Sequence, residues 1–406
     1  MLKIKLTLPL QIALALVLAV ILGLIFPSLS IYTSWMGTVF LRALRMIVAP
    51  LILTSIITGI GRLKGGKDFG RLALKTFSFY IGTGLIAILT GLWLVNMIKP
   101  GIGANLGSGV QAGDLKAAPD SFSENLVRII PDNIFTALAQ NDMVAIVFIS
   151  MLFGFFITRL DQDDRTVMNR FFEAANNLIM KITSFIIRFS PLGIFGIIIK
   201  IVSEQENLPE LIYRLGLYML VVTGGLLIHS MIVLPVILRF LGKINPLKHG
   251  KAMLTPLLTA FSTSSSNATL PLTMTAMEEN AGVSNKISSF TLPLGATINT
   301  DGTALYEIVA VMFIAQAYGI DLSAAEQVIC VLTALLATIG VAGIPMAGMV
   351  SMGIILSAVG LPLEGIGLIL GVDRVLDMFR TSVNVWGDTC ICVLVAKSEG
   401  EKIYTS

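Results

Sequence analysis

The chain has 406 residues, of which 55% are hydrophobic and 13% are charged, and its mean hydropathy is +0.86. Soluble domains are about 25% charged, so this composition excludes a water-soluble fold. The net charge is only +3, and Lys and Arg fall in short clusters between apolar stretches, which gives no support to nucleic-acid binding. With three cysteines and two histidines, the chain indicates neither a disulfide framework nor a soft-metal site.

Six long apolar segments in the first part of the chain predict membrane-spanning helices. A bilayer core of about 30 Å requires about 20 apolar residues per helix. The first segment follows Lys3 and Lys5 without a small-residue cleavage site, so we interpret it as a retained span rather than a signal peptide. The predicted spans are residues 8–27, 37–61, 71–98, 133–159, 167–202 and 210–241.

Basic residues in the loops predict how these spans are oriented. They follow the second, fourth and sixth spans, whereas residues 28–36 carry none and the loop at 203–210 is acidic. The positive-inside rule therefore predicts a multi-pass protein of the inner (plasma) membrane with both termini cytoplasmic. The basic residues are Arg62, Lys64, Lys67, Arg71 and Lys75, then Arg159, Arg165 and Arg170, then Arg239, Lys243, Lys248 and Lys251.

After residue 245, polar residues, glycine and proline interrupt the apolar segments at membrane depth. Two segments are split at Phe261–Pro271 and Ile339–Pro345, which leaves short arms suited to hairpins that enter and leave on one face. Irregular backbone at this depth survives only when it is buried in protein or lines a wet cavity. Each hairpin is followed by one long apolar helix. The hairpins and helices, in chain order, are 252–279, 282–318, 322–358 and 361–396.

This organisation predicts an all-α membrane protein with eight transmembrane helices and two re-entrant hairpins. Many secondary transporters build binding sites from repeats whose broken helices meet at the bilayer midplane. Helix N-termini then face anionic groups and freed carbonyl groups face cations. We therefore divide the chain into a scaffold half, residues 1–245, and a site-bearing half, residues 246–406.

The last long helix carries polar residues inside an otherwise apolar span. At about 100° per residue they lie within an arc of about 80°. A charge at mid-bilayer costs on the order of 3 kcal/mol or more, so this stripe requires partners or a hydrated site. It is either an ion-pair network that only holds helices together, or a substrate site in which Arg380 binds a carboxylate and Asp377 an ammonium group. The stripe consists of Asp373, Asp377, Arg380, Asn384 and Asp388, with Thr381 adjacent.

The seventh crossing is interrupted at its centre by Asn299, Asp301 and Gly302. Unwinding there would free carbonyl groups, and hard cations such as Na⁺ favour oxygen ligands. A kink filled by water is the alternative, but a kink does not require a carboxylate. Glu307 follows within the apolar run, where it either carries a proton or pairs with an Arg elsewhere. His229 has no clustered partner and is predicted to be a packed histidine.

Three motifs resemble the signatures of the glutamate transporter family, the dicarboxylate/amino acid:cation symporters. They are Thr263–Pro271, Asn299–Thr303 and Asp377–Asp388, and the likeness extends to Met46–Pro50 and Pro191–Phe195. The resemblance implies inverted repeats, a homotrimer and elevator-type alternating access. It assigns spans 1, 2, 4 and 5 to a trimerisation scaffold. Spans 3, 6, 7 and 8 and both hairpins would move as a transport domain.

The resemblance also implies which residues bind substrate and ions. Asp377 would hold the substrate amine and Arg380 its side-chain carboxylate, with the second hairpin as the extracellular gate. The substrate set is Ser266, Thr303, Ile344, Gly348, Asp377, Arg380, Thr381 and Asn384. The implied sodium sites are Gly295, Asn299, Asn384 and Asp388; Tyr80, Thr83, Asn299 and Asp301; and Thr297 with carbonyl groups near Thr338, Ile339 and Val341. Glu307 is the implied proton carrier, and no organic cofactor is implied.

The sequence departs from the family pattern at several positions. Thr300 stands where sodium-coupled members usually have Met, and Glu307 matches the animal glutamate transporters rather than the archaeal aspartate transporters, which have Gln. Ser264 and Met378 leave both usual positions of an auxiliary Arg unfilled. The number of sodium ions, the role of protons or potassium, and the choice between aspartate and glutamate therefore stay open.

Other functions are weighed against a sodium-coupled carrier of acidic amino acids. A proton-coupled C4-dicarboxylate carrier would lack Asp377, and a neutral amino acid carrier would lack Arg380. A passive anion channel is a further alternative. An intramembrane hydrolase is disfavoured, because no His or Lys lies in the motif half close to Ser264–Ser266 to act as general base. The chain is therefore not predicted to be an enzyme.

Overall fold

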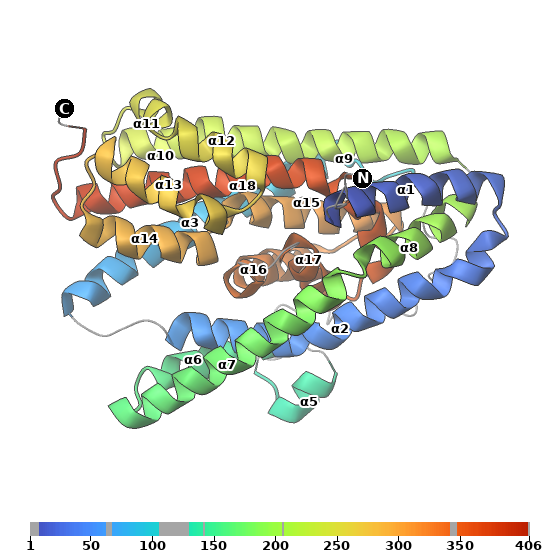
Figure 1. Ribbon diagram of the computed structural model, residues 1–406, viewed down its shortest axis with the longest axis horizontal. Helices are drawn as coiled ribbons and strands as arrows, with labels where there is room; N and C mark the ends of the chain where they lie inside the picture. The colour runs from blue at the N-terminus through green and yellow to red at the C-terminus, as the bar shows by residue number, and fades with distance from the viewer. Residues whose placement is uncertain are drawn as a thin grey trace, which may run out of the picture.

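The computed structural model describes residues 8–61, 67–104, 130–140, 143–204, 207–341 and 347–404. Every regular element in these ranges is helical, and none is a strand, which confirms the all-α prediction. Most long helices lie alongside one another (Figure 1). The helices of the first half are α1 (Leu8–Ile25), α2 (Leu29–Gly61), α3 (Lys67–Ile98), α5 (Ile134–Ala139), α6 (Met143–Ile157), α7 (Gln162–Ile187), α8 (Ser190–Glu204), α9 (Leu208–Ile228) and α10 (Leu234–Phe240).

Several predicted spans differ from the observed helices. The second begins at Leu29 rather than at residue 37, because the polar residues near its start do not break a helix. The fifth is two helices, α7 and α8, bent by 51°. By length and composition, four helical stretches of the described chain could cross a membrane, or five if the bent pair is one span. The predicted count of eight spans is therefore not established by length and composition alone.

The second half contains both predicted hairpins and both long helices. Its helices are α11 (Pro246–Ala252), α12 (Leu254–Thr263), α13 (Ser266–Glu279), α14 (Asn285–Ile298), α15 (Asp301–Ala317), α16 (Ala324–Val341), α17 (Ala347–Ala358) and α18 (Ile366–Ser398). The first hairpin turns at Ser264, whose φ of 51° ends α12 in the left-handed conformation. Ser265 then caps α13 by accepting a hydrogen bond from the Ala268 N–H at 3.2 Å. Residues 342–346, which include Ile344, lie outside the described ranges.

The seventh crossing is broken where the sequence predicts. α14 ends at Ile298 and α15 starts at Asp301, with Asn299 and Thr300 in non-helical conformations between them. α18 is continuous over 33 residues and packs against both α14 and α15. The polar stripe of α18 therefore runs past the break in the neighbouring helix.

The helices pack in two groups that are joined by further contacts. α2 packs against α6, α7 and α8, and α1 packs against α8. α15 contacts α3, α9, α16, α17 and α18. The second hairpin, α16 and α17, also contacts α2, so it lies between the two groups.

The C-terminal residues attach to one end of the helix array. Glu399 accepts hydrogen bonds from Lys75 Nζ at 2.6 Å and Arg71 Nη2 at 2.8 Å, which lower the pKa of its carboxyl group. The Tyr404 hydroxyl group contacts the ring of His249. Burial lowers the pKa of the His249 imidazole to about 3. Two of the predicted basic clusters therefore lie at the same end of the molecule as the C-terminus.

The crossing of α2 and α8 depends on glycine. A Cβ atom on Gly196 would lie 2.7 Å from the backbone nitrogen of Gly37 and 2.7 Å from the carbonyl oxygen of Thr33. A Cβ atom on Gly37 would in turn lie 2.6 Å from the Ile197 side chain. Small residues allow this close approach of two backbones, as at many helix interfaces in membranes.

We expect Gly196→Val to force α2 and α8 apart and to lower the melting temperature of the purified protein. Overpacking of this kind costs about 1–3 kcal/mol. Thermal unfolding followed by tryptophan fluorescence measures the change. Gly216→Val is the matched control, because nothing lies within 4 Å of a Cβ atom at Gly216. Equal melting temperatures for the two variants would contradict the close contact.

Candidate functional site

The polar stripe of α18 faces the protein interior. Asp373, Arg380, Asn384 and Asp388 are buried, whereas Asp377 is partly exposed. Arg380 Nη2 lies 2.6 Å from Asp377 Oδ1, and Arg380 Nη1 lies 3.5 Å from Asp373 Oδ1. Part of the ion-pair network is therefore present that would be expected if these residues only held helices together. It does not include Asp388, which lies farther along the helix.

The guanidinium group of Arg380 is enclosed by further elements. It stands 4.3 Å from the centre of the Tyr306 ring on α15, a distance suited to a cation–π interaction. A Cβ atom on Gly348 would lie 2.5 Å from Arg380 Nη1, so the start of α17 runs directly against the guanidinium group. The second hairpin is thus in contact with the residue that is predicted to bind the substrate carboxylate.

The first hairpin also packs against this part of α18. Ser382 Oγ donates to the carbonyl oxygen of Leu257 at 3.2 Å. The rings of Phe261 and Phe379 meet edge to face, with centres 5.1 Å apart. Ser266 begins α13 at the hairpin turn and is partly buried. Both hairpins therefore border the Asp377 and Arg380 region.

Asn384 joins α18 to the start of α15. Its Oδ1 atom accepts hydrogen bonds from the backbone N–H groups of Gly302 at 2.8 Å and Thr303 at 3.3 Å, and its Nδ2 atom donates to Thr303 Oγ1 at 3.1 Å. The first N–H groups of a helix have no partner within the helix. Asn384 supplies a partner for them from a distant segment. This contact brings two of the predicted substrate residues, Asn384 and Thr303, together.

Asp388 and Asn299 form a second polar contact at the break. Asn299 Nδ2 donates to Asp388 Oδ1 at 2.9 Å, while Asn299 Oδ1 is buried and has no hydrogen-bond partner among the described residues. The Gly295 carbonyl oxygen accepts from the Asn299 N–H at 2.8 Å. A Cβ atom on Gly295 would lie 2.5 Å from Asp388 Oδ1 and 2.6 Å from the Tyr80 hydroxyl oxygen. Oxygen atoms from three helices therefore converge here.

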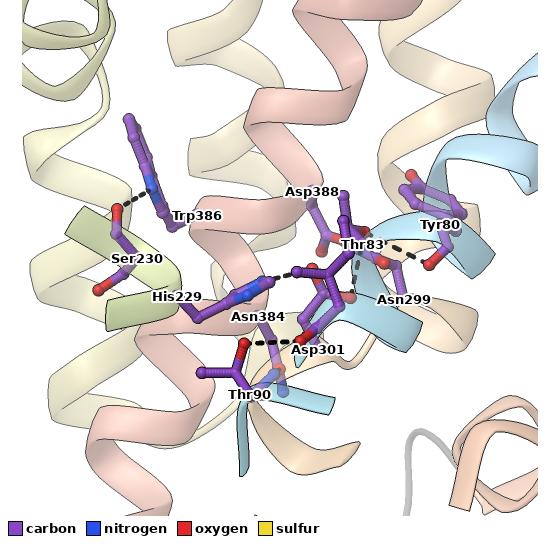
Figure 2. A network of polar contacts seen from close by, with 12 residues as sticks. Tyr80, Thr83, Thr90, His229, Ser230, Asn299, Asp301, Asn384, Trp386 and Asp388 are labelled. Carbon is purple, nitrogen blue, oxygen red and sulfur yellow. Dashed lines mark hydrogen bonds and ion pairs between the residues drawn. The ribbon is translucent and has the colours of Figure 1, made fainter. Parts of the chain in front are cut away.

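Asp301 accepts hydrogen bonds from two other helices (Figure 2). Thr83 Oγ1 donates to Asp301 Oδ1 at 3.2 Å, and His229 Nε2 lies 3.1 Å from Asp301 Oδ2. The Tyr80 hydroxyl group donates to the Thr291 carbonyl oxygen at 2.8 Å. The prediction that His229 has no partner was wrong: the residue is buried, but it is bonded to the carboxylate of Asp301.

The residues of the third predicted sodium site are only partly described. The hydroxyl groups of Thr297 and Thr338 donate to carbonyl groups of their own helices, at 2.9 Å to Leu294 and 2.9 Å to Leu335. Thr338, Ile339 and Val341 belong to the last turn of α16, which packs against α14.

Glu307 is fully buried on α15. The Ser351 hydroxyl group of α17 donates to Glu307 Oε1 in a very short hydrogen bond. Glu307 Oε2 is buried and has no hydrogen-bond partner within the described ranges. No Arg of those residues forms an ion pair with Glu307, so the alternative reading of a paired Glu is not supported.

Comparison with known proteins connects this geometry to one family. Residues 8–398 match the sodium:dicarboxylate symporter family. The chain is 35% identical to excitatory amino acid transporter 3 of Mus musculus, over 97% of the chain and 86% of that relative. It is 34% identical to the proton/sodium-glutamate symport protein of Geobacillus stearothermophilus, over 98% of the chain and 96% of the relative. An excitatory amino acid transporter of Caenorhabditis elegans is 35% identical over 89% of the chain and 80% of its own length.

The chain belongs to the sodium:dicarboxylate symporter family. The resemblance drawn from the three motifs is thereby confirmed. The relatives are named as transporters, which agrees with the prediction that this symporter-family protein is not an enzyme.

Sequence reasoning missed two contacts of this symporter-family protein. His229 lies six residues before Pro235 in an apolar helix, and an ionisable residue within a membrane span is a signal of function that could have been followed. Ser351 offers no comparable signal, because a single serine in an apolar helix is common. Its contact with Glu307 depends on how α17 packs against α15.

Proposed function

We propose that this protein is a secondary active symporter that takes up an acidic amino acid, aspartate or glutamate, together with Na⁺. The observation that carries the proposal is the pair formed by Arg380 and Asp377, whose Nη2 and Oδ1 atoms lie 2.6 Å apart beside the second hairpin. A cation and an anion held together in this way can exchange partners. The substrate carboxylate would replace Asp377 at the guanidinium group, and the substrate ammonium group would replace Arg380 at Asp377.

Burial distinguishes the two members of this pair. The side chain of Arg380 is 4% exposed and that of Asp377 is 23% exposed. Arg380 can therefore select a carboxylate by a desolvated bidentate contact, which is stronger than the same contact in water. Thr381 and Asn384, one and four residues farther along α18, would bind the remaining polar groups of the amino acid, with Ser266, Thr303, Ile344 and Gly348 completing the site.

Sodium would bind at the break between α14 and α15. Asp388 and Asp301 are buried, and neither forms an ion pair with a Lys or Arg of the described chain. Leaving a buried charge without compensation costs several kcal/mol, about 3–5 when one partner of an ion pair is removed. A cation held by these carboxylates and nearby oxygens would remove that cost.

The ligand sets proposed for the first two sodium sites fit the oxygen atoms that the structure brings together. For the first, the unpartnered Oδ1 atom of Asn299 is available beside Asp388 and Gly295. Asn384 Oδ1 already accepts two hydrogen bonds, so Asn384 would contribute its backbone carbonyl group instead. For the second, Thr83 and Asp301 are in contact, with Tyr80 and Asn299 as the further proposed ligands.

The third sodium site would use Thr297 and the carbonyl groups of Thr338, Ile339 and Val341. The last carbonyl groups of a helix lack partners within it and carry partial negative charge. α16 ends at Val341, and α16 packs against α14, which supports a site that both helices would share. Closure of the second hairpin and binding of this ion would then be linked.

The arrangement of the helices supports an elevator-type transporter. We propose eight membrane spans and two re-entrant hairpins, a homotrimer in the plasma membrane and cytoplasmic termini. Spans 1, 2, 4 and 5 correspond to α1, α2, α6 and the bent pair α7 and α8. The packing of α2 against the other four of these helices supports their role as a scaffold. The packing of α15 against α3, α9, α18 and the second hairpin supports a separate transport domain, whose core is residues 246–406.

Replacement of Arg380 by Cys tests the substrate assignment. We expect uptake of labelled aspartate and glutamate into liposomes to fall by about 30-fold or more, because loss of one member of a buried charge pair costs about 2–5 kcal/mol. Uptake of a neutral amino acid should persist. Arg374→Cys is the control, since the side chain of Arg374 is 49% exposed and its contact with Asp377 is long, at 3.8 Å between Nη1 and Oδ2. Unchanged uptake of acidic amino acids in Arg380→Cys would refute the assignment.

Replacement of Gly295 by Ala tests the first sodium site without changing any charge. The added Cβ atom would lie 2.5 Å from Asp388 Oδ1 and must displace the carboxylate. We expect the Na⁺ concentration for half-maximal aspartate uptake to rise about tenfold, since displaced metal ligands lose affinity on that scale. Gly216→Ala has open space around it and serves as control. An unaltered sodium titration would count against this site.

Replacement of Glu307 by Gln tests whether protons are carried at this position. Gln keeps an acceptor for the Ser351 hydroxyl group but cannot exchange a proton. We expect any pH dependence of aspartate turnover, measured in liposomes with imposed proton gradients, to be lost. Glu204→Gln on the exposed end of α8 is the control. Persistence of the pH dependence in Glu307→Gln would place the proton elsewhere.

A further inference from the structure

His229 lies at an irregular turn between α9 and α10. Residues His229–Val233 form a π-helical segment, a rare element that is frequent at functional sites. Pro235 follows it, and a proline has no N–H group and its ring clashes with the carbonyl group four residues earlier. In the wider turn the Leu234 N–H bonds to the His229 carbonyl oxygen rather than to that of Ser230, so the Ser230 carbonyl group loses this helical partner.

The carbonyl group released by this turn has a partner on another helix. The indole Nε1 of Trp386 on α18 donates to the Ser230 carbonyl oxygen at 3.0 Å. The turn is therefore held by the helix that carries Asn384 and Asp388. Figure 2 shows Trp386 and Ser230 on one side of His229, with Asp301 on the other.

The hydrogen bonds of His229 define how its ring acts. Its Nε2 atom lies 3.1 Å from Asp301 Oδ2, and an ionised carboxylate only accepts, so Nε2 is the donor. Its Nδ1 atom is buried and has no partner among the described residues. A proton on Nδ1 would be a buried donor without an acceptor, so the contacts fit an uncharged ring that donates from Nε2. Asp301 then receives a hydrogen bond at Oδ2 from His229.

The orientation of the Asp301 carboxylate is set from several directions. Thr83 on α3 donates to Oδ1 at 3.2 Å, and His229 donates to Oδ2. On the side of α18, a Cβ atom on Gly387 would lie 3.2 Å from Oδ2, so that backbone also limits the carboxylate. Groups that hydrogen-bond to a metal ligand orient it, and they contribute to metal affinity without touching the ion.

We propose that His229 is a positioning residue for the cation site at Asp301, where it sets sodium affinity through its hydrogen bond to Oδ2. The proposal rests on the function proposed above, in which Asp301 binds a coupling ion. It adds a residue of the π-helical turn between α9 and α10 to a site whose other members lie on α3, at the break after α14 and at the start of α15. The π-helical turn is the device that directs the imidazole ring to the carboxylate.

Two substitutions distinguish positioning from packing. His229→Leu fills much of the same space but cannot donate a hydrogen bond. In His229→Gln the amide nitrogen reaches about as far as Nε2, so the donor is kept. Two Na⁺ half-points are the readouts. The first is the Na⁺ concentration that gives half of the sodium-induced rise in melting temperature of the purified protein, and the second is the Na⁺ concentration that gives half-maximal aspartate uptake.

We expect His229→Leu to raise both half-points about 10- to 100-fold, the range seen when partners of metal ligands are removed. The KM for aspartate at saturating Na⁺ should stay within about twofold, since the affected site is the cation site. His229→Gln should restore the half-points to within about threefold of the wild-type values. His249→Leu, which removes the other buried histidine, should lower the melting temperature but leave the sodium half-points unchanged.

Wild-type half-points in His229→Leu would overturn the proposal, as would equal losses in the Leu and Gln variants. If His229→Leu does not fold, His229→Asn replaces it, because its amide group ends near the Nδ1 position and falls short of Asp301. If neither the melting temperature nor the aspartate uptake of the wild-type protein depends on Na⁺, the proposed sodium-coupled function itself is overturned. The two failures are therefore distinguishable.

Discussion

The need to compensate buried negative charge governs this structure. Asp301 and Asp388 lie in the protein interior, where a charge without a partner is costly, and the described chain places no Lys or Arg against either of them. Their neighbours are neutral donors: Thr83, His229 and the amide group of Asn299. Neutral donors orient a carboxylate but do not cancel its charge. This arrangement supports the proposal that a cation binds here.

The broken helix and the continuous helix have complementary roles in meeting this requirement. The break between α14 and α15 leaves polar groups without partners in a helix, and side chains of α18 form hydrogen bonds with some of them. Asn384 covers the first N–H groups of α15, and Asp388 accepts from Asn299 on the other side of the break. These contacts link three segments, and in the proposed function a cation that altered one of them would also affect the contact between Asn384 and Thr303.

The two proposed sites along α18 differ in charge. The proposed substrate region already contains a cation and an anion, Arg380 and Asp377, in contact with each other. The proposed sodium region contains anions with neutral partners. A zwitterionic acid can exchange partners in the first region, whereas the second region can be completed only by positive charge. Coupled transport in this proposal follows from the two kinds of site lying on one rigid helix, bordered by the second hairpin at Gly348 and Ser351.

The amino-acid sequence alone was enough to predict the all-helical membrane class, the two hairpins, the break at Asn299 and the polar stripe of α18. These features follow from apolar length, from helix-breaking residues and from a 3.6-residue period, all of which are local properties. It did not determine which donors meet which carboxylates. His229 and Asp301 are 72 residues apart, and Ser351 and Glu307 are 44 apart. Such contacts depend on how helices pack and, for His229, on one π-helical turn. The periodicity of the sequence encodes neither the packing nor the turn, so these contacts became visible only in the folded chain.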